Sequence, residues 1–289
     1  LASVKPVLLS VSINSANIKM RKWLMNDGHP EVAIASLPLL KDYQIPFIAS
    51  IVPWPGLPLS DINRTIEYAE NNDAYAVRIY LPGYTRYFPI KNNYKASDYW
   101  IKISKYIRSL SRKHTLPLLV VPHMYVESQI YKEIDRPRVI GVIKNSPAYL
   151  GGVKPDDLIK EIDGEPIESV ERAIDALREN KHKTIRMKII RNRAAAIVEM
   201  NDGQKDKYPY CFAELRHNTP FGIFLTERYI SHDDVIDVRR YIDIHDAKNI
   251  LVIASANSLP YIRYLMKKYS ILKSTGANIR LVVAKNYFY

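Results

Sequence analysis

Cysteine is almost absent from this chain, because Cys211 is the only one among its 289 residues. A single thiol cannot form a disulfide within the chain, and this usage is typical of a reducing compartment. It also excludes any site that needs several cysteine ligands from this chain alone. We expect Cys211, which lies between Tyr210 and Phe212, to be a small buried residue.

Long apolar runs and several catalytic motifs are absent too. No stretch approaches the roughly eighteen apolar residues of a membrane-spanning helix, and no secretory signal pattern is present. We therefore expect a cytoplasmic protein with no membrane partner. The sequence contains no P-loop and no G-x-S-x-G, which gives no support to phosphoryl transfer or serine hydrolysis. The histidines show no H-E-x-x-H or comparable spacing; a metal is suggested only by His232, Asp233 and Asp234 near His245 and Asp246, a group that we interpret as a solvated acidic loop.

Charge of one sign is in moderate excess, with 42 basic and 30 acidic residues and a formal net charge of +12. The excess is divided among the N-terminal, central and C-terminal parts of the chain. Nucleic-acid binding needs a basic face that follows the phosphates. We therefore expect a generally solvated basic surface and no nucleic-acid partner.

The stretch 138–193 has the most informative pattern. A β-branched run, a small-residue turn, a Gly-Gly pair, an apolar strand, an Asp-Gly turn, a helix and a closing strand follow one another. This order resembles the PDZ domains of bacterial proteases, with Asp157 in place of the usual Gly-Asp pair. The pattern predicts strands at 139–143, 158–162 and 184–190 and a helix at 169–179.

PDZ domains bind chain ends by adding the peptide as a strand and holding its carboxylate on backbone amides of a glycine-containing loop. The residues before this segment, 129–137, contain no glycine, so the sequence shows no such loop there. Two interpretations stay open. The segment binds a peptide or protein partner, or it packs against its own chain.

Four strand and helix steps precede the PDZ-like segment. The predicted strands are 7–13, 47–52, 76–81 and 118–121, with helices between them, and Ser60 is the predicted cap of the third helix. This alternation predicts a parallel α/β layer, either a partial barrel or an open sheet. In both, the ligand site lies at the carboxyl ends of the strands.

Three motifs follow these strands, namely 14–17, Trp54-Pro55-Gly56 and Gly83-Tyr84-Thr85-Arg86-Tyr87. At these spacings they resemble the later half of the radical-SAM barrel in a family of uncharacterised iron-sulfur oxidoreductases. That family joins the barrel to a PDZ-like domain and a C-terminal domain of unknown function. Here Asn14 replaces a histidine and Trp54 a cysteine, and the PDZ-like segment lies in the middle, whereas the family usually has it first.

The C-terminal part adds to this resemblance. Strands at 249–254 and 279–283 flank a predicted helix at 259–269, which is the pattern of a βαβ unit. The chain ends in a segment that resembles an Asn-Arg-Phe-Phe-Gly-Gly-like motif of the family's C-terminal domain, matched by Asn286, Phe288 and Tyr289. The chain stops where the glycines would follow and starts near the midpoint of such a barrel, which favours a fragment over a natural relative without the chemistry.

The resemblance implies S-adenosylmethionine (SAM) and a [4Fe–4S] cluster as cofactors. It places Asn14, Ser15, Pro55, Gly56, Gly83 and Tyr84 at the cofactor end of the barrel, and Trp54, Thr85, Arg86 and Asn286 near the substrate. The cluster needs three thiolates, usually from a C-x3-C-x2-C motif. This chain lacks that motif, so we expect it to bind neither cofactor alone.

These observations predict an α/β protein with three domains. They are a partial radical-SAM-like (β/α) barrel at 1–130, a PDZ-like domain at 136–193 and a C-terminal α/β domain at 197–289. The predicted function is part of a radical-SAM-like oxidoreductase of unknown substrate, with the PDZ-like domain binding a peptide or partner. The alternative is a non-catalytic, PDZ-centred binding scaffold. We also expect the PDZ-like segment to dock on its neighbours, because its connections lack the Gly/Ser character of flexible linkers.

Overall fold

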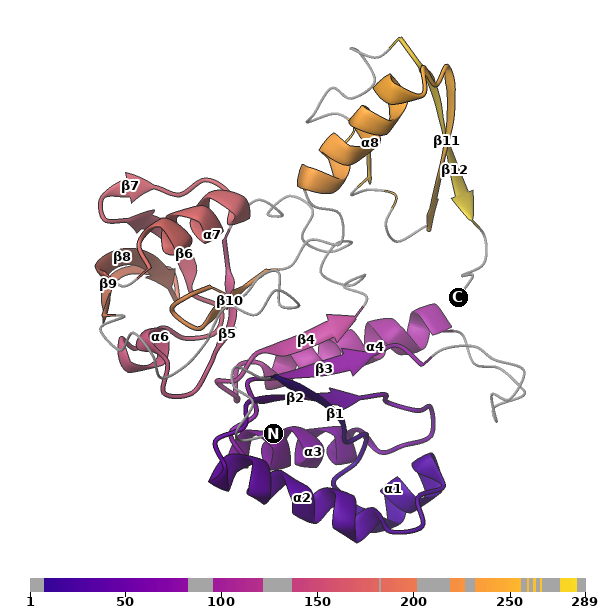
Figure 1. Cartoon of the computed structure of the whole chain (residues 1–289), viewed down its shortest axis with the longest axis vertical. Coiled ribbons are helices and arrows are strands. Elements are labelled where there is room, and N and C mark those ends of the chain that lie inside the picture. Colours follow the sequence, from indigo (N-terminus) through magenta and orange to yellow (C-terminus); the bar gives the residue numbers. More distant parts are fainter. Residues whose placement is uncertain are drawn as a thin grey trace. The chain divides into compact units, whose positions relative to one another are not determined.

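The computed structural model describes residues 8–82, 96–121, 137–181, 183–201, 219–226, 232–255, 259, 262–263, 266 and 276–284. Contacts divide the chain into two compact units, of which the first holds the N-terminal sheet and the PDZ-like segment and the second the C-terminal part. Each unit is described by itself (Figure 1).

A parallel sheet forms the N-terminal part of the first unit. Its strands are β1 (Leu9–Ser12), β2 (Phe47–Ile51), β3 (Ala76–Tyr80) and β4 (Leu118–Val121), in the spatial order β1-β2-β3-β4. The helices between them are α1 (Ile18–Met25), α2 (Pro30–Asp42), α3 (Leu59–Asn71) and α4 (Ala96–Leu110). Figure 1 shows α2 and α3 on the same side of the sheet. The predicted parallel α/β layer is confirmed, and every residue of β2 is buried, as expected where helices cover parallel strands.

The predicted cap of α3 is wrong. The helix begins at Leu59, one residue before Ser60, and its N-cap is Pro58, which makes no side-chain capping bond. The proline carbonyl accepts a hydrogen bond from the Asp61 N–H at 2.9 Å and so closes the first turn early. Because proline holds its own φ near the value found here, −65°, it sets the chain direction into the helix without a polar side chain.

The PDZ-like segment has the elements that its sequence predicts. They are β5 (Val139–Val142), α6 (Pro147–Leu150), β6 (Leu158–Ile162), β7 (Glu165–Pro166), α7 (Val170–Glu179) and β8 (Thr184–Arg191). The side chains of Ser146 and Ser169 cap α6 and α7. Asp163 and Gly164 both have positive φ and join β6 to β7 in the predicted tight turn.

Two further strands contribute to this segment from beyond residue 193. The strand β9 (Ala194–Asn201) pairs antiparallel with β8 along its whole length. The strand β10 (Ile223–Leu225) returns from far along the chain and pairs antiparallel with β5. Side chains of both strands lie in the same apolar core as α7.

The departure at Asp157 has a structural explanation. Asp156, the residue before it, adopts a φ of 71° in the left-handed region, which aspartate tolerates better than most residues. Asp157 is fully buried. Its carboxylate accepts hydrogen bonds from Arg191 Nε and Nη2 at 2.7 and 2.6 Å and from the Lys154 N–H at 2.8 Å. The buried carboxylate is therefore paired with the partly buried Arg191 and hydrogen-bonded, as a buried charge requires.

The PDZ-like segment docks on the parallel sheet within the first unit. Phe224 of β10 and Ile143 pack in one buried cluster with residues of the sheet, namely Ile48, Tyr75, Ala76 and Leu119. The Val142 N–H donates to the Thr115 carbonyl at 2.9 Å. Lys144 Nζ lies 2.7 Å from Asp73 Oδ1. The expected docking on neighbouring parts of the chain is confirmed for the parallel sheet.

The second unit contains α8 (His232–Ile244), β11 (Asn249–Ser255) and β12 (Asn278–Ala284). The two strands pair in parallel over seven residues, and a parallel pair requires a crossover connection. The C-terminal α/β region is thus confirmed. Across the described parts of both units, no helix combines the length and apolar character needed to cross a bilayer.

Candidate functional site

The carboxyl edge of the parallel sheet is the first candidate, because strand-end loops meet there in (β/α) folds. The Asn14 side-chain oxygen accepts a hydrogen bond from the Val52 N–H at 3.0 Å. This bond joins the loop after β1 to the loop after β2. The structure therefore brings two of the three predicted motifs to one edge.

Asn14 and Ser15 use their polar groups to build the first loop. Asn14 has a left-handed φ of 57°, and its amide nitrogen lies 2.7 Å from Met25 Sδ. Ser15 is fully buried, and its hydroxyl accepts from the Asn17 N–H at 3.0 Å. Both side chains point to partners inside the protein, so they shape the loop.

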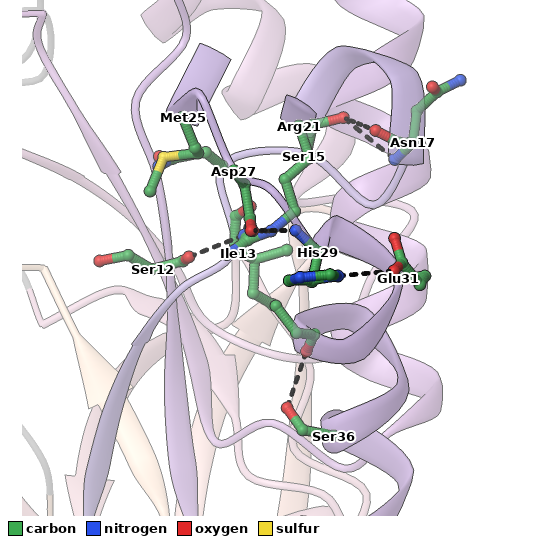
Figure 2. A network of polar contacts seen from close by, with 12 residues as sticks. Ser12, Ile13, Ser15, Asn17, Arg21, Met25, Asp27, His29, Glu31 and Ser36 are labelled. Atoms are coloured by element: carbon green, nitrogen blue, oxygen red, sulfur yellow. Dashed lines mark hydrogen bonds and ion pairs between the residues drawn. The ribbon is translucent and has the colours of Figure 1, made fainter. Parts of the chain in front are cut away.

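Arg21 organises the same edge and was not predicted from the sequence. Its Nη1 donates to the Ile13 and Ser12 carbonyls at 2.6 and 3.1 Å, and its Nε donates to Asp27 Oδ2 at 3.0 Å. Figure 2 shows the guanidinium reaching the end of β1. A hydrogen bond from the His29 N–H, more than the contact with Arg21, lowers the pKa of Asp27, which keeps the partner of Arg21 ionised.

The Trp54-Pro55-Gly56 motif forms a tight turn after β2. The Leu57 N–H donates to the Trp54 carbonyl at 3.1 Å, and Gly56 has a φ of 94°, a conformation that side chains disfavour. The Tyr99 hydroxyl of α4 donates to the Pro53 carbonyl at 2.9 Å, and burial raises the pKa of Tyr99. The turn is thus held by the helix beside it.

The other predicted site residues, Gly83, Tyr84, Thr85, Arg86 and Asn286, lie outside the described residues. Their placement beside Asn14 and Trp54 therefore stays a prediction. Within the described ranges, no group of three or more metal-ligating side chains comes together.

The second candidate is the edge of β10 in the PDZ-like segment. In an antiparallel pair, alternate residues direct their N–H and C=O groups to the partner strand. The Gly222 carbonyl accepts from the Ile143 N–H and the Thr226 N–H donates to the Arg138 carbonyl, both at 2.9 Å. These residues therefore face β5. The pairing is irregular between Phe224 and Leu225, but Gly222 and Thr226 both face β5, so alternation along β10 directs the backbone groups of Ile223 and Leu225 to the opposite edge.

A turn built on Thr219 and Gly222 precedes this edge. The Gly222 N–H donates to the Thr219 carbonyl at 2.9 Å, and the Thr219 N–H donates to the Ile223 carbonyl at 3.1 Å. The Thr219 hydroxyl accepts from the Ile223 N–H at 3.3 Å. Gly222 has a φ of 77°, and a Cβ atom there would lie 2.4 Å from Ser146 Cβ. The position therefore requires glycine.

This turn contains a glycine, which the residues before the PDZ-like segment lack. It follows the segment in sequence and does not precede it. The signal was present as Phe221-Gly222-Ile223-Phe224-Leu225, a glycine inside a short apolar run after the last predicted strand of the segment. Only its pairing with β5 shows that it belongs to the same domain.

A family model for PDZ domains matches residues 138–191. This segment therefore belongs to the PDZ domain family, as its sequence pattern predicts. The match covers a minor part of the chain and assigns this domain alone.

Several solved structures resemble parts of the chain. GtR34C from Geobacillus thermodenitrificans is 31% identical, over 24% of this chain and 79% of that chain, with a TM-score of 0.21. The HtrA-type protease AlgW with a decapeptide is 26% identical, over 22% of this chain and 20% of that chain, with a TM-score of 0.21. Streptococcus suis SuiB, also solved with bound S-adenosylmethionine, is 15% identical, over 45% of this chain and 31% of that chain, with a TM-score of 0.38. The chain thus spans less than a third of SuiB, and similarities at these TM-scores assign no function to it.

Proposed function

We propose that this chain recognises a peptide or protein partner through its PDZ domain, by pairing an extended segment of the partner with the edge of β10. PDZ domains bind their ligands by strand addition. The observation that carries the proposal is the direction of the Leu225 backbone groups, away from β5 and beside the Gly222 turn. We further propose that the domain extends from 137 to 226, because β9 and β10 supply part of its core.

The energetics of Leu225 support a partner at this edge. The residue is fully buried, and alternation along β10 directs its N–H and C=O away from β5, because Gly222 and Thr226 bond to that strand. A buried backbone group without a partner costs about 1–3 kcal/mol. An added strand would bond both groups of Leu225 at once, which stabilises the complex through the backbone of the partner.

Hydrogen exchange measured by NMR on the full chain tests this proposal. A peptide selected from a display library serves as the probe, and we expect it to slow exchange of the Leu225 amide. The Phe224 amide is the matched control, because alternation directs it to β5 with or without a ligand. Binding that leaves Leu225 exchange unchanged, or selection that yields no binder, would contradict the proposal. The second outcome would favour a module that packs against its own chain.

We propose as a second function that the parallel sheet is part of a SAM-dependent iron-sulfur oxidoreductase. The motif resemblance suggests it, and the bond between Asn14 and Val52 favours it, because two motif loops share the carboxyl edge. Asn14, Ser15, Pro55, Gly56, Gly83 and Tyr84 are the proposed cofactor residues, and Trp54, Thr85, Arg86 and Asn286 the substrate residues.

The residues present do not fit the iron-sulfur cluster, because Cys211 is the only thiol and a cluster needs several. The cluster would have to be held by residues outside this sequence. The coding sequence upstream of Leu1 provides the test. A C-x3-C-x2-C motif within about 150 residues, one domain length, would support the enzyme, and a start codon at Leu1 would contradict it.

A further inference from the structure

Resting on the proposed peptide recognition, we infer that the partner segment is an internal extended stretch of polypeptide and not a free chain end. The reason lies at Thr219, whose own atoms occupy the backbone groups that would otherwise hold a terminal carboxylate.

Two backbone amides at the start of β10 are already bonded within the turn. A carboxylate bound in PDZ fashion accepts from backbone amides of the glycine-containing loop, and Gly222 and Ile223 supply two of the amides of this turn. The Gly222 N–H is bonded to the Thr219 carbonyl at 2.9 Å, and the Ile223 N–H to the Thr219 hydroxyl at 3.3 Å. The Ile223 carbonyl accepts from the Thr219 N–H at 3.1 Å. Thr219 thus makes the contacts that the last residue of a bound chain end would make.

The turn that carries Thr219 is held firmly in place. Thr219 and Phe221 are fully buried, and the Phe221 carbonyl accepts from the Ala148 N–H of α6 at 3.0 Å. Gly222 lies against Ser146, so a Cβ atom at position 222 would be 2.4 Å from Ser146 Cβ. Displacing Thr219 would disturb these contacts together. A ligand could therefore bond to the Gly222 and Ile223 amides only at a cost in free energy.

A terminal carboxylate brought to the Gly222 and Ile223 amides would find both N–H groups bonded to Thr219. The Thr219 hydroxyl also lies 3.3 Å from the Ile223 carbonyl, to which it can donate. A desolvated carboxylate without donors is strongly unfavourable. The Leu225 N–H and C=O, in contrast, pair equally well with a residue in the middle of a strand. The edge therefore selects an extended segment without requiring its end.

The test compares free and amidated chain ends on the full chain. Two display libraries are selected, one with internal segments flanked on both sides and one with free C-termini. The best binder is then synthesised with a C-terminal carboxylate and with a C-terminal amide. We expect the two forms to bind within about twofold of each other. Amidation that weakens binding more than about tenfold, the effect of losing strong hydrogen bonds to a charged group, would overturn the inference while leaving peptide recognition intact. No binder from either library would overturn both.

The variant Thr219→Val tests the role of the hydroxyl alone, because valine has nearly the shape of threonine but lacks the oxygen that accepts from the Ile223 N–H. We expect the variant to gain about 2–10-fold in its preference for the carboxylate form, the value of one hydrogen bond. Thr219→Ser keeps the hydroxyl and should keep the wild-type preference. An unchanged preference in a folded valine variant would contradict the inference. If the valine variant does not fold, the comparison of free and amidated peptides on the wild type still decides.

Discussion

Gly141 of β5 gives the sharpest test of the docking between the PDZ domain and the parallel sheet. A Cβ atom at this position would lie 2.6 Å from both Cα and N of Pro117 and 2.9 Å from the carbonyl carbon of Leu116. All three are backbone atoms, so no change of side-chain rotamer can relieve the contact. In Gly141→Ala, β5 must therefore move away from the chain that leads into β4.

Two effects of Gly141→Ala lower the free energy of unfolding, and one smaller effect raises it. Overpacking of a close contact costs about 1–3 kcal/mol. The same movement lengthens the bond from the Val142 N–H to the Thr115 carbonyl, 2.9 Å in the wild type, which contributes about 0.5–1.5 kcal/mol. Alanine also lowers the conformational entropy of the unfolded chain, which raises the free energy of unfolding by about 0.4–1 kcal/mol. We expect a net decrease of about 1–3 kcal/mol in the free energy of unfolding.

Urea unfolding of the full chain measures this loss, and exchange of the Val142 amide locates it. Gly28→Ala is the matched control, because no heavy atom lies within 4 Å of the position that a Cβ atom would take there, and its φ is not in the left-handed region. That control should stay within about 0.5 kcal/mol of wild type or be slightly more stable. Equal unfolding midpoints for the two variants, with unchanged exchange at Val142, would refute the docking contact.

Three further changes test the bonds described above. Asp157→Ala should lower the free energy of unfolding by about 3 kcal/mol, measured in urea, because it leaves Arg191 partly buried without its carboxylate. Burial alone would raise the pKa of Glu70, but hydrogen bonds from His114 and backbone amides hold it below its ordinary value. This stabilisation is complete above about pH 5 and is lost as the pH falls through the lowered pKa, so Glu70→Gln should reduce the loss of stability measured from pH 6 to 3. Arg21→Met should cost about 1–3 kcal/mol in the same urea assay, because the Ser12 carbonyl loses the Arg21 donor and the Ile13 carbonyl keeps only the Ser15 N–H.

Each of these predictions has a control. Asp157→Asn can still accept the Lys154 N–H and should cost less than alanine, so equal losses would contradict the role of that bond. Parallel acid titrations of wild type and Glu70→Gln would contradict the lowered pKa. Lys19→Met removes an exposed cation from the same helix as Arg21 and should change stability by less than about 0.5 kcal/mol.

Much of the first unit could be predicted because its signals are local. The strands β4 and β6 lie where the apolar runs predict them, and Asp163-Gly164 turns the chain between β6 and β7. Strand alternation and turn chemistry act over a few residues, so they can be read directly from sequence. The local signal was insufficient at Ser60, because Pro58 starts α3 earlier without a polar cap.

The candidate site depended more on the tertiary structure. Nothing in the sequence distinguishes Arg21 from Lys19 two positions earlier, yet only Arg21 is buried against the end of β1. The predicted Asn14 lies at the expected edge, but its side chain joins two loops. The position of a residue in a sequence motif predicts where in the fold its side chain lies. The hydrogen-bond partners of that side chain depend on which other segments lie next to it in the folded protein.

The sequence by itself determined the parallel α/β layer, the order of the PDZ elements and the shortage of thiols. Each follows from composition or from periodicity within one segment. Only the tertiary structure shows that β10 pairs with β5 of the PDZ domain, with the Arg138 N–H donating to Thr226 Oγ1 across 88 positions, and that Thr219 bonds to the turn before β10. Pairing at such a separation is chosen by the burial of Phe224 and its neighbours against two surfaces at once. This pairing therefore depends on the folded core, and the periodicity of the β10 sequence does not predict it.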